Sequence, residues 1–212
     1  MSGSDWFRRE QWTPEIAAEF EHRLSRARRR RGEYLAIQAL TLAATQKPEL
    51  ALPAIELARR HLQIDPDGIR AAQMHATIAR AFATTGDLDA ATEAYRQAIE
   101  RERSRPNVRG YHYLDYAWFA ATRGLSDLYD EVLEAMRRNG VDRDLVFPVN
   151  QFRSFGALAM ISAHLGDAEH ARQMARNALA AAAAAVGPFG RALGLVLDSS
   201  SVERERLSAL AR

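Results

Sequence analysis

The sequence predicts an all-α protein, a right-handed α-solenoid of about four helix pairs with a capping helix at each end. Apolar residues recur at helical spacing along most of the 212 residues, and small residues and turn glycines return at similar places in successive segments. Segments of this kind cannot bury their apolar faces alone, so they are expected to stack. We expect a single domain over 1–212, with a capping segment at 1–32, helix pairs over 33–185 and a C-terminal cap over 186–212.

The clearest helix pair covers residues 72–105, where two apolar-periodic stretches flank a turn at Gly86 and Asp87. Small side chains let the helix backbones approach, and aromatic rings fill the gaps between successive pairs. The residues at these places are Ala79, Phe82, Ala91, Tyr95 and Ala98. This arrangement resembles the tetratricopeptide repeat, and the resemblance implies a stack of antiparallel helix pairs.

Two later segments resemble the same repeat. One contains Gly124, with Tyr129 where the motif has alanine, and the other contains Gly166 and Asp167. The turn glycines are 38 and 42 residues apart (124 − 86 and 166 − 124), longer than the ~34 residues of the usual repeat. Longer helices or linkers are therefore expected.

The first pair is expected within 33–66, ending at Asp65 and Pro66. Pro53 lies inside its second apolar stretch, and a proline within a helix removes a backbone hydrogen bond and clashes with the preceding turn. The sequence therefore predicts that this second helix begins near Leu52 rather than at Glu49.

The N-terminal segment is predicted to close one end of the stack. Thr13 is placed to cap a helix that starts at Pro14, and we expect the aromatic residues before it to cover the first pair. These are Trp6, Phe7 and Trp12. The WFR..W pattern also resembles uncharacterised bacterial tetratricopeptide proteins.

The C-terminal segment is predicted to close the other end. The last repeat helix is expected to break at Gly187, Pro188 and Gly190. A closing helix would then start after Ser200 or Ser201, either of which can act as its cap.

Composition limits the classes of function. The chain has no cysteine, which excludes disulfides and thiolate chemistry and fits a reducing compartment. The net charge is only +2, Lys47 is the single lysine among 29 basic residues, and we take this arginine bias as bacterial. The N-terminus lacks a secretory signal and no apolar run could span a bilayer, so a cytoplasmic location is expected.

The resemblance implies that the first helix of each pair lines a concave groove, and the residues on that face are the predicted contacts with another protein or peptide. Trp and Arg dominate interface hot spots, and Arg80, Tyr111, Trp118 and Arg153 are the expected anchors. Packing between helices is an equally weighted alternative for Trp118 and Tyr111. The full predicted set is Gln73, Arg80, Tyr111, Asp115, Trp118, Arg153 and His164.

An arginine-rich run over 23–31 offers an alternative function, a regulator that contacts nucleic-acid phosphates. The run lacks the interleaved aromatic residues of a single-strand platform, and a solvated helix end paired with Glu19 or Glu21 is the favoured interpretation. The possible phosphate contacts are Arg26, Arg28, Arg29, Arg30 and Arg31.

Catalysis is not predicted. The six histidines show no metal-binding spacing, and the glycines after residue 186 lack the lysine and hydroxyl residues of a phosphate loop. We therefore expect no enzyme activity, no metal and no cofactor. The favoured function is a protein- or peptide-binding scaffold acting as adaptor, assembly factor or regulator.

Overall fold

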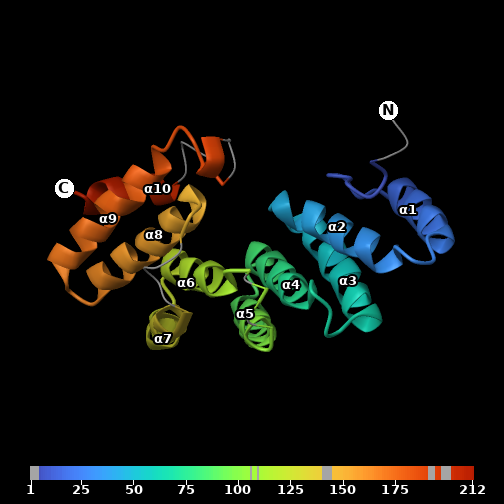
Figure 1. Cartoon of the computed structure of the whole chain (residues 1–212), viewed down its shortest axis with the longest axis horizontal. Coiled ribbons are helices and arrows are strands. Elements are labelled where there is room, and N and C mark those ends of the chain that lie inside the picture. Colours follow the sequence, from blue (N-terminus) through green and yellow to red (C-terminus); the bar gives the residue numbers. More distant parts are fainter. Residues whose placement is uncertain (1–4, 106, 109, 140–144, 191–193, 197–201) are drawn as a thin grey trace. The chain divides into compact units, whose positions relative to one another are not determined.

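The computed structural model describes residues 5–105, 107–108, 110–139, 145–190, 194–196 and 202–212. Within these residues it contains ten α-helices and two short 3-10 helices, and no strand (Figure 1). The chain divides into two compact units, Met1–His112 and Tyr113–Arg212. The all-helical prediction is confirmed. Handedness, the number of repeats and the single-domain organisation stay predictions.

The first unit contains five helices. In chain order they are α1 (Pro14–Arg26), α2 (Arg31–Ala44), α3 (Pro48–Ile64), α4 (Ala71–Thr85) and α5 (Leu88–Arg103). Helices α2 and α3 pack against each other, as do α4 and α5, and α4 also packs on both α3 and α2. This contact pattern is consistent with a helical repeat.

The second unit contains the remaining elements. They are α6 (His112–Arg123), η1 (Ser126–Leu128), α7 (Tyr129–Asn139), α8 (Pro148–His164), α9 (Ala168–Ala182), η2 (Pro188–Gly190) and α10 (Val202–Leu210). Helices α8 and α9 lie side by side, and α10 packs on both of them (Figure 1).

The α4–α5 pair forms as the sequence predicts. Gly86 ends α4 with a φ of 83°, in the left-handed region that glycine reaches without a Cβ penalty. The Asp87 side chain then accepts a hydrogen bond from the backbone N–H of Ala90 at 3.1 Å and caps α5. Ala79 and Ala91 are fully buried, which lets the two helices approach closely.

The α8–α9 pair repeats this turn. Gly166 has a φ of 84°, and the Asp167 side chain accepts a hydrogen bond from the N–H of His170 at 3.0 Å. The predicted turn at Gly166 and Asp167 is therefore confirmed. The third pair differs at Tyr129, which is buried where the motif would place alanine.

The α2–α3 pair corrects one prediction. Helix α3 begins at Pro48 rather than near Leu52, and Pro53 lies inside it. Pro48 suits the first helical position because its missing N–H would have no partner there. Leu50 and Ala51 in the first turn are buried, and this packing outweighs the single backbone hydrogen bond lost at Pro53. Gln46, with a φ of 55°, takes the position of the turn glycine.

Helix α1 starts as predicted at Pro14, and the Thr13 hydroxyl accepts a hydrogen bond from the N–H of Ile16 at 3.3 Å. Phe20 and Leu24 form its buried face. Residues 5–12, which we name the N-terminal strap, have no regular secondary structure.

The C-terminal end agrees in outline with the prediction. Helix α9 ends at Ala182, slightly before the expected break, and η2 contains Pro188 and Gly190. The closing helix is α10, and its Leu207 is fully buried. The predicted caps Ser200 and Ser201 lie outside the described residues. None of the helices in the described part of the chain is long and apolar enough to cross a membrane.

Candidate partner-binding faces

Five of the seven predicted contact residues occupy equivalent positions in successive pairs. Gln73, Tyr111 and Arg153 stand at the same distance before the turn glycines Gly86, Gly124 and Gly166. Arg80 and Trp118 share a second equivalent position, nearer to their turns. These residues thus share sequence positions on α4, α6 and α8, with Tyr111 directly before α6, and their surroundings differ.

Arg80 on α4 is half-buried and held loosely. Its Nη2 lies 3.5 Å from the hydroxyl of Thr77, at the outer limit of a hydrogen bond, and its Nε is buried without a hydrogen-bond partner in the described part of the chain. About two turns before Arg80, the side-chain oxygen of Gln73 lies 3.4 Å from Arg70 Nη1. No described carboxylate forms an ion pair with Arg80.

Tyr111 lies directly before α6 in a strained backbone conformation. Its φ is 57°, a region that residues with a Cβ rarely adopt. The Glu102 carboxylate holds this conformation, because its Oε1 accepts hydrogen bonds from the N–H groups of Gly110 (2.6 Å) and Tyr111 (2.9 Å), and its Oε2 accepts one from His112 (3.1 Å). The sequence analysis missed Glu102, and no local motif identifies a carboxylate that caps a helix eight to ten residues later.

Asp115 and Arg153 form an ion pair within the second unit. Arg153 Nη1 lies 2.7 Å from Asp115 Oδ1, and the two side chains are 36% and 16% exposed. This charge-assisted hydrogen bond joins α6 to α8. The Arg153 guanidinium is therefore already engaged, and a ligand carboxylate would have to share it or displace Asp115.

Trp118 packs within the second unit. Its ring centroid lies 5.2 Å from that of Phe152, and the two rings are tilted by 49°. A Cβ added at Gly156 would lie 2.6 Å from Cζ3 of Trp118, so the absence of a side chain at Gly156 makes room for the indole. Trp118 remains half-buried and joins the apolar cluster that includes Leu207. Packing is thus its observed role, and contact with a partner stays a prediction.

His164 lies exposed at the last position of α8. Its ring packs edge-on against Tyr129, with centroids 5.2 Å apart and planes at 88°. This contact ties the end of α8 to the start of α7.

The predicted phosphate-binding arginines lie at the α1–α2 connection. Arg26 ends α1, Arg31 begins α2, and all five are exposed. Arg30 is engaged, because it donates two hydrogen bonds to Glu33 and lies over the ring of Tyr34. The expected pairing with Glu19 is formed by Arg23 at 2.7 Å, whereas Glu21 pairs with Arg60 of α3.

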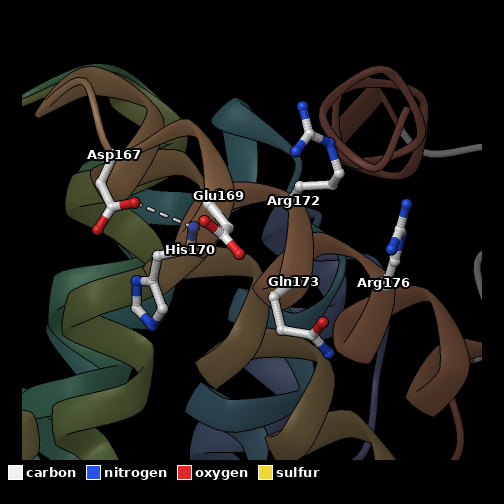
Figure 2. Close-up of a pocket in the computed structure, with 6 residues that line it drawn as sticks. All are labelled: Asp167, Glu169, His170, Arg172, Gln173 and Arg176. Atoms are coloured by element: carbon white, nitrogen blue, oxygen red, sulfur yellow. Dashed lines mark hydrogen bonds between the residues drawn. The ribbon is translucent and has the colours of Figure 1, made fainter.

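A shallow pocket of about 470 Å³ lies along α9 (Figure 2). Its carboxylates lie at the start of α9 and its guanidinium groups further along the helix, and Arg176 Nε donates a hydrogen bond to the carbonyl of Ala211 at 3.2 Å. Most of the lining side chains are exposed, so the pocket is an uneven stretch of charged surface rather than an enclosed site. Its lining residues are Asp167, Glu169, His170, Arg172, Gln173 and Arg176.

Comparison with known proteins supports the repeat. Residues 72–105, which form most of α4 and α5, match the family model of the tetratricopeptide repeat. No curated protein and no solved structure gives a significant match to the chain. The match supports the tetratricopeptide repeat superfamily and, with it, a protein-interaction scaffold in general.

Tetratricopeptide repeats are a non-catalytic scaffold family, which is consistent with the prediction that the chain is not an enzyme. Among the described residues, no cluster of three histidine, aspartate or glutamate side chains could hold a metal ion. The match lends no support to the nucleic-acid alternative. The resemblance to bacterial WFR..W proteins and the cytoplasmic location stay predictions.

Proposed function

We propose that this chain is a peptide-binding scaffold that captures an acidic segment of a partner protein on one face of α4. The face consists of polar side chains spaced three or four residues apart, so that they point in one direction along the helix. These are Arg70 at the N-cap, then Gln73, Thr77, Arg80 and Thr84; Thr77 is fully buried, so the other four side chains are the ones that a ligand can contact.

The observation that carries the proposal is the state of Arg80. A half-buried guanidinium with no described carboxylate partner and an unsatisfied Nε is prepared for an incoming anion. Partial burial strengthens such a contact because water competes less well for it. The location of this residue in the segment that matches the repeat model adds support.

Neighbouring side chains supply further donors for the same ligand. Arg70 lies at the start of α4, and the amide of Gln73 can donate to a peptide carbonyl. We infer that the ligand binds in an extended conformation along α4, with one carboxylate at Arg80 and backbone contacts at Gln73.

An acidic peptide library screened against the full chain tests the proposal. The best binder is measured by fluorescence anisotropy with wild type, Arg80→Ala, Arg80→Lys and the exposed control Arg28→Ala. Loss of an arginine–carboxylate anchor is expected to weaken binding about 30-fold, equivalent to about 2 kcal/mol. Arg80→Lys should recover only part of this, since lysine lacks the bidentate geometry. Arg28→Ala removes the same charge and should leave affinity unchanged.

Two results would overturn the proposal. The first is a library in which no acidic peptide binds wild type. The second is equal weakening by Arg80→Ala and Arg28→Ala, which would show that only the overall positive charge matters.

A further inference from the structure

The N-terminal strap lies against α1 and α2 but belongs to neither helix. Helix α1 begins independently, with its own cap at Thr13 and Pro14 at its first position. The strap therefore requires no helical hydrogen bonds, and α1 requires none from the strap. Its attachment rests on side chains of α1 and α2.

The side chain of Gln38 on α2 forms hydrogen bonds with the backbone of the N-terminal strap. Its side chain is fully buried, its Oε1 accepts a hydrogen bond from the N–H of Arg9 at 2.9 Å, and its Nε2 donates one to the carbonyl of Arg9 at 2.7 Å. One amide thus satisfies both backbone groups of a single residue, as a neighbouring β-strand would. This recognition does not depend on the side chain at that position, provided that it is not proline.

Aromatic rings provide the sequence preference. The Trp6 ring lies 5.2 Å from Phe20 and 4.8 Å from Tyr34, and the Phe7 ring lies 4.6 Å from Tyr34. Trp12 packs on Phe20 from the other end of the strap at 5.3 Å. Aromatic pairs at these separations add specificity beyond the area that they bury.

A carboxylate on α1 recognises the cation of the strap. Arg9 Nη2 lies 3.7 Å from Glu19 Oε2, whereas Glu19 Oε1 pairs with Arg23 at 2.7 Å. The Nε of Arg9 is buried and has no hydrogen-bond partner among the described residues. The strap is therefore an imperfect occupant, and a better-fitting arginine could gain a hydrogen bond that Arg9 lacks.

We propose that the surface of α1 and α2 formed by Phe20, Tyr34, Gln38 and Glu19 is a binding site for an extended segment of a partner protein with two adjacent aromatic residues followed two residues later by arginine. The strap is its built-in competitor. A tethered segment acts at an effective concentration of the order of millimolar, so a free segment binds well only when the strap is weakened or displaced. This site is separate from the α4 face, and either proposal can fail without the other.

Peptide binding to the full chain tests the proposal. The probe is a labelled peptide of residues 5–12, DWFRREQW, with a scrambled peptide as its control. Binding is measured with wild type, with the double variant Trp6→Ala/Phe7→Ala, and with that variant carrying either Gln38→Leu or the exposed control Gln63→Leu on α3. Circular dichroism verifies that each variant is folded.

We expect the strap variant to bind the peptide at least ~10-fold more tightly than wild type, because the competitor is weakened. Adding Gln38→Leu should reduce this binding by about 10-fold or more, since both backbone groups of the ligand lose their partner. Gln63→Leu should not change it. Equal affinities for the strap variant with and without Gln38→Leu, or for the designed and scrambled peptides, would overturn the proposal.

Hydrogen exchange on wild type provides a test that does not depend on folding of the variants. A displaceable strap predicts that the Arg9 amide exchanges through local opening, well before the amides of Leu35 and Ala39 in the buried part of α2. Exchange of all three amides at the same rate would show that the strap opens only when the unit unfolds. The strap would then be a fixed structural cover, and the proposal would be wrong.

Discussion

The corresponding faces of α4 in the first unit and of α6 and α8 in the second unit have the same repeat positions but different chemistry. On α4, the only hydrogen-bond contact of the Arg80 side chain with the described residues is a long one to a hydroxyl. At the equivalent position of α6, Trp118 packs over Gly156 and against Phe152. On α8, Arg153, which is equivalent to Gln73, is paired with Asp115. Side chains at equivalent positions of the repeat therefore differ in how readily they could contact a ligand.

This difference indicates where a ligand could bind with the least disruption of existing contacts. A partner at α4 meets an arginine whose charge has no described counter-ion, whereas a partner at α6 and α8 must disrupt an ion pair and an aromatic contact. We therefore expect substitutions on this face of α4 to affect binding and substitutions on the corresponding faces of α6 and α8 to affect stability.

Trp118→Ala is expected to have the largest effect on stability. Truncating a half-buried indole that packs on Phe152 should lower the free energy of unfolding by about 3 kcal/mol, at the lower end of the range for large aromatic residues. Arg80→Ala, the matched position on α4, should change it by less than about 0.5 kcal/mol. Urea unfolding monitored by circular dichroism measures both. Equal losses for the two variants would contradict the comparison.

Gly156→Ala should have the next largest effect. The new Cβ would lie 2.6 Å from a rigid indole ring, and overpacking of this kind lowers the free energy of unfolding by about 1–3 kcal/mol, despite the better helix propensity of alanine. In a Trp118→Ala background this contact disappears and only Leu207 Cδ1, at 3.3 Å, stays close, so the same substitution should become nearly neutral or stabilising. The double variant is the control. If Gly156→Ala lowered the free energy of unfolding equally in both backgrounds, contact with the Trp118 indole would not be the cause.

The Asp115–Arg153 ion pair should make a smaller contribution. Both side chains are partly exposed, and a double-mutant cycle with Asp115→Asn and Arg153→Gln is expected to give a coupling free energy of about 0.5–1 kcal/mol. The coupling should decrease at high salt. A coupling near zero would mean that Arg153 is as available for a ligand as Arg80.

The smallest expected effect concerns pH and the first unit. Burial, followed by the charge of Arg101, lowers the pKa of His75 on α4, and a hydrogen bond with Gln97 partly offsets this. Between the lowered pKa of the folded unit and the pKa of the unfolded chain, His75 is thus neutral when folded and protonated when unfolded. The resulting stabilisation is present above the unfolded pKa of about 6.5 and is lost as the pH falls below it.

Unfolding by urea at about pH 7.5 and about pH 5 tests this prediction. Wild type should lose more stability on acidification than His75→Gln, and the exposed position His22→Gln carries the matched control substitution. The same loss in wild type and His75→Gln would show that His75 does not contribute.

The turns of the helix pairs were predictable from sequence because their signals are local. Gly86 and Gly166 supply the left-handed conformation, and the aspartate that follows each of them caps the next helix. The prediction from Pro53 was wrong because it, too, used only a local signal. A local penalty predicted a later start for α3, and tertiary packing of Leu50 overrode it.

The surroundings of the candidate residues could not be predicted, because they depend on contacts between distant parts of the chain. Arg153 and Asp115 are 38 residues apart, and Gln38 and Arg9 are 29 apart. One signal for Gln38 did exist, since a glutamine in the apolar stretch 35–42 is expected to be buried and therefore to need a specific hydrogen-bond partner. Which partner it finds requires coordinates.

Helix α10 packs on α9 and α8 in the way that α4 packs on α3 and α2, so it occupies the position of the first helix of an additional pair. Its nine residues bury Leu207 and close the apolar surface that α8 and α9 would otherwise expose. We therefore expect the stack to be modular at this end. A designer or a gene duplication could insert a whole helix pair before α10 and lengthen the protein without redesigning the preceding helices.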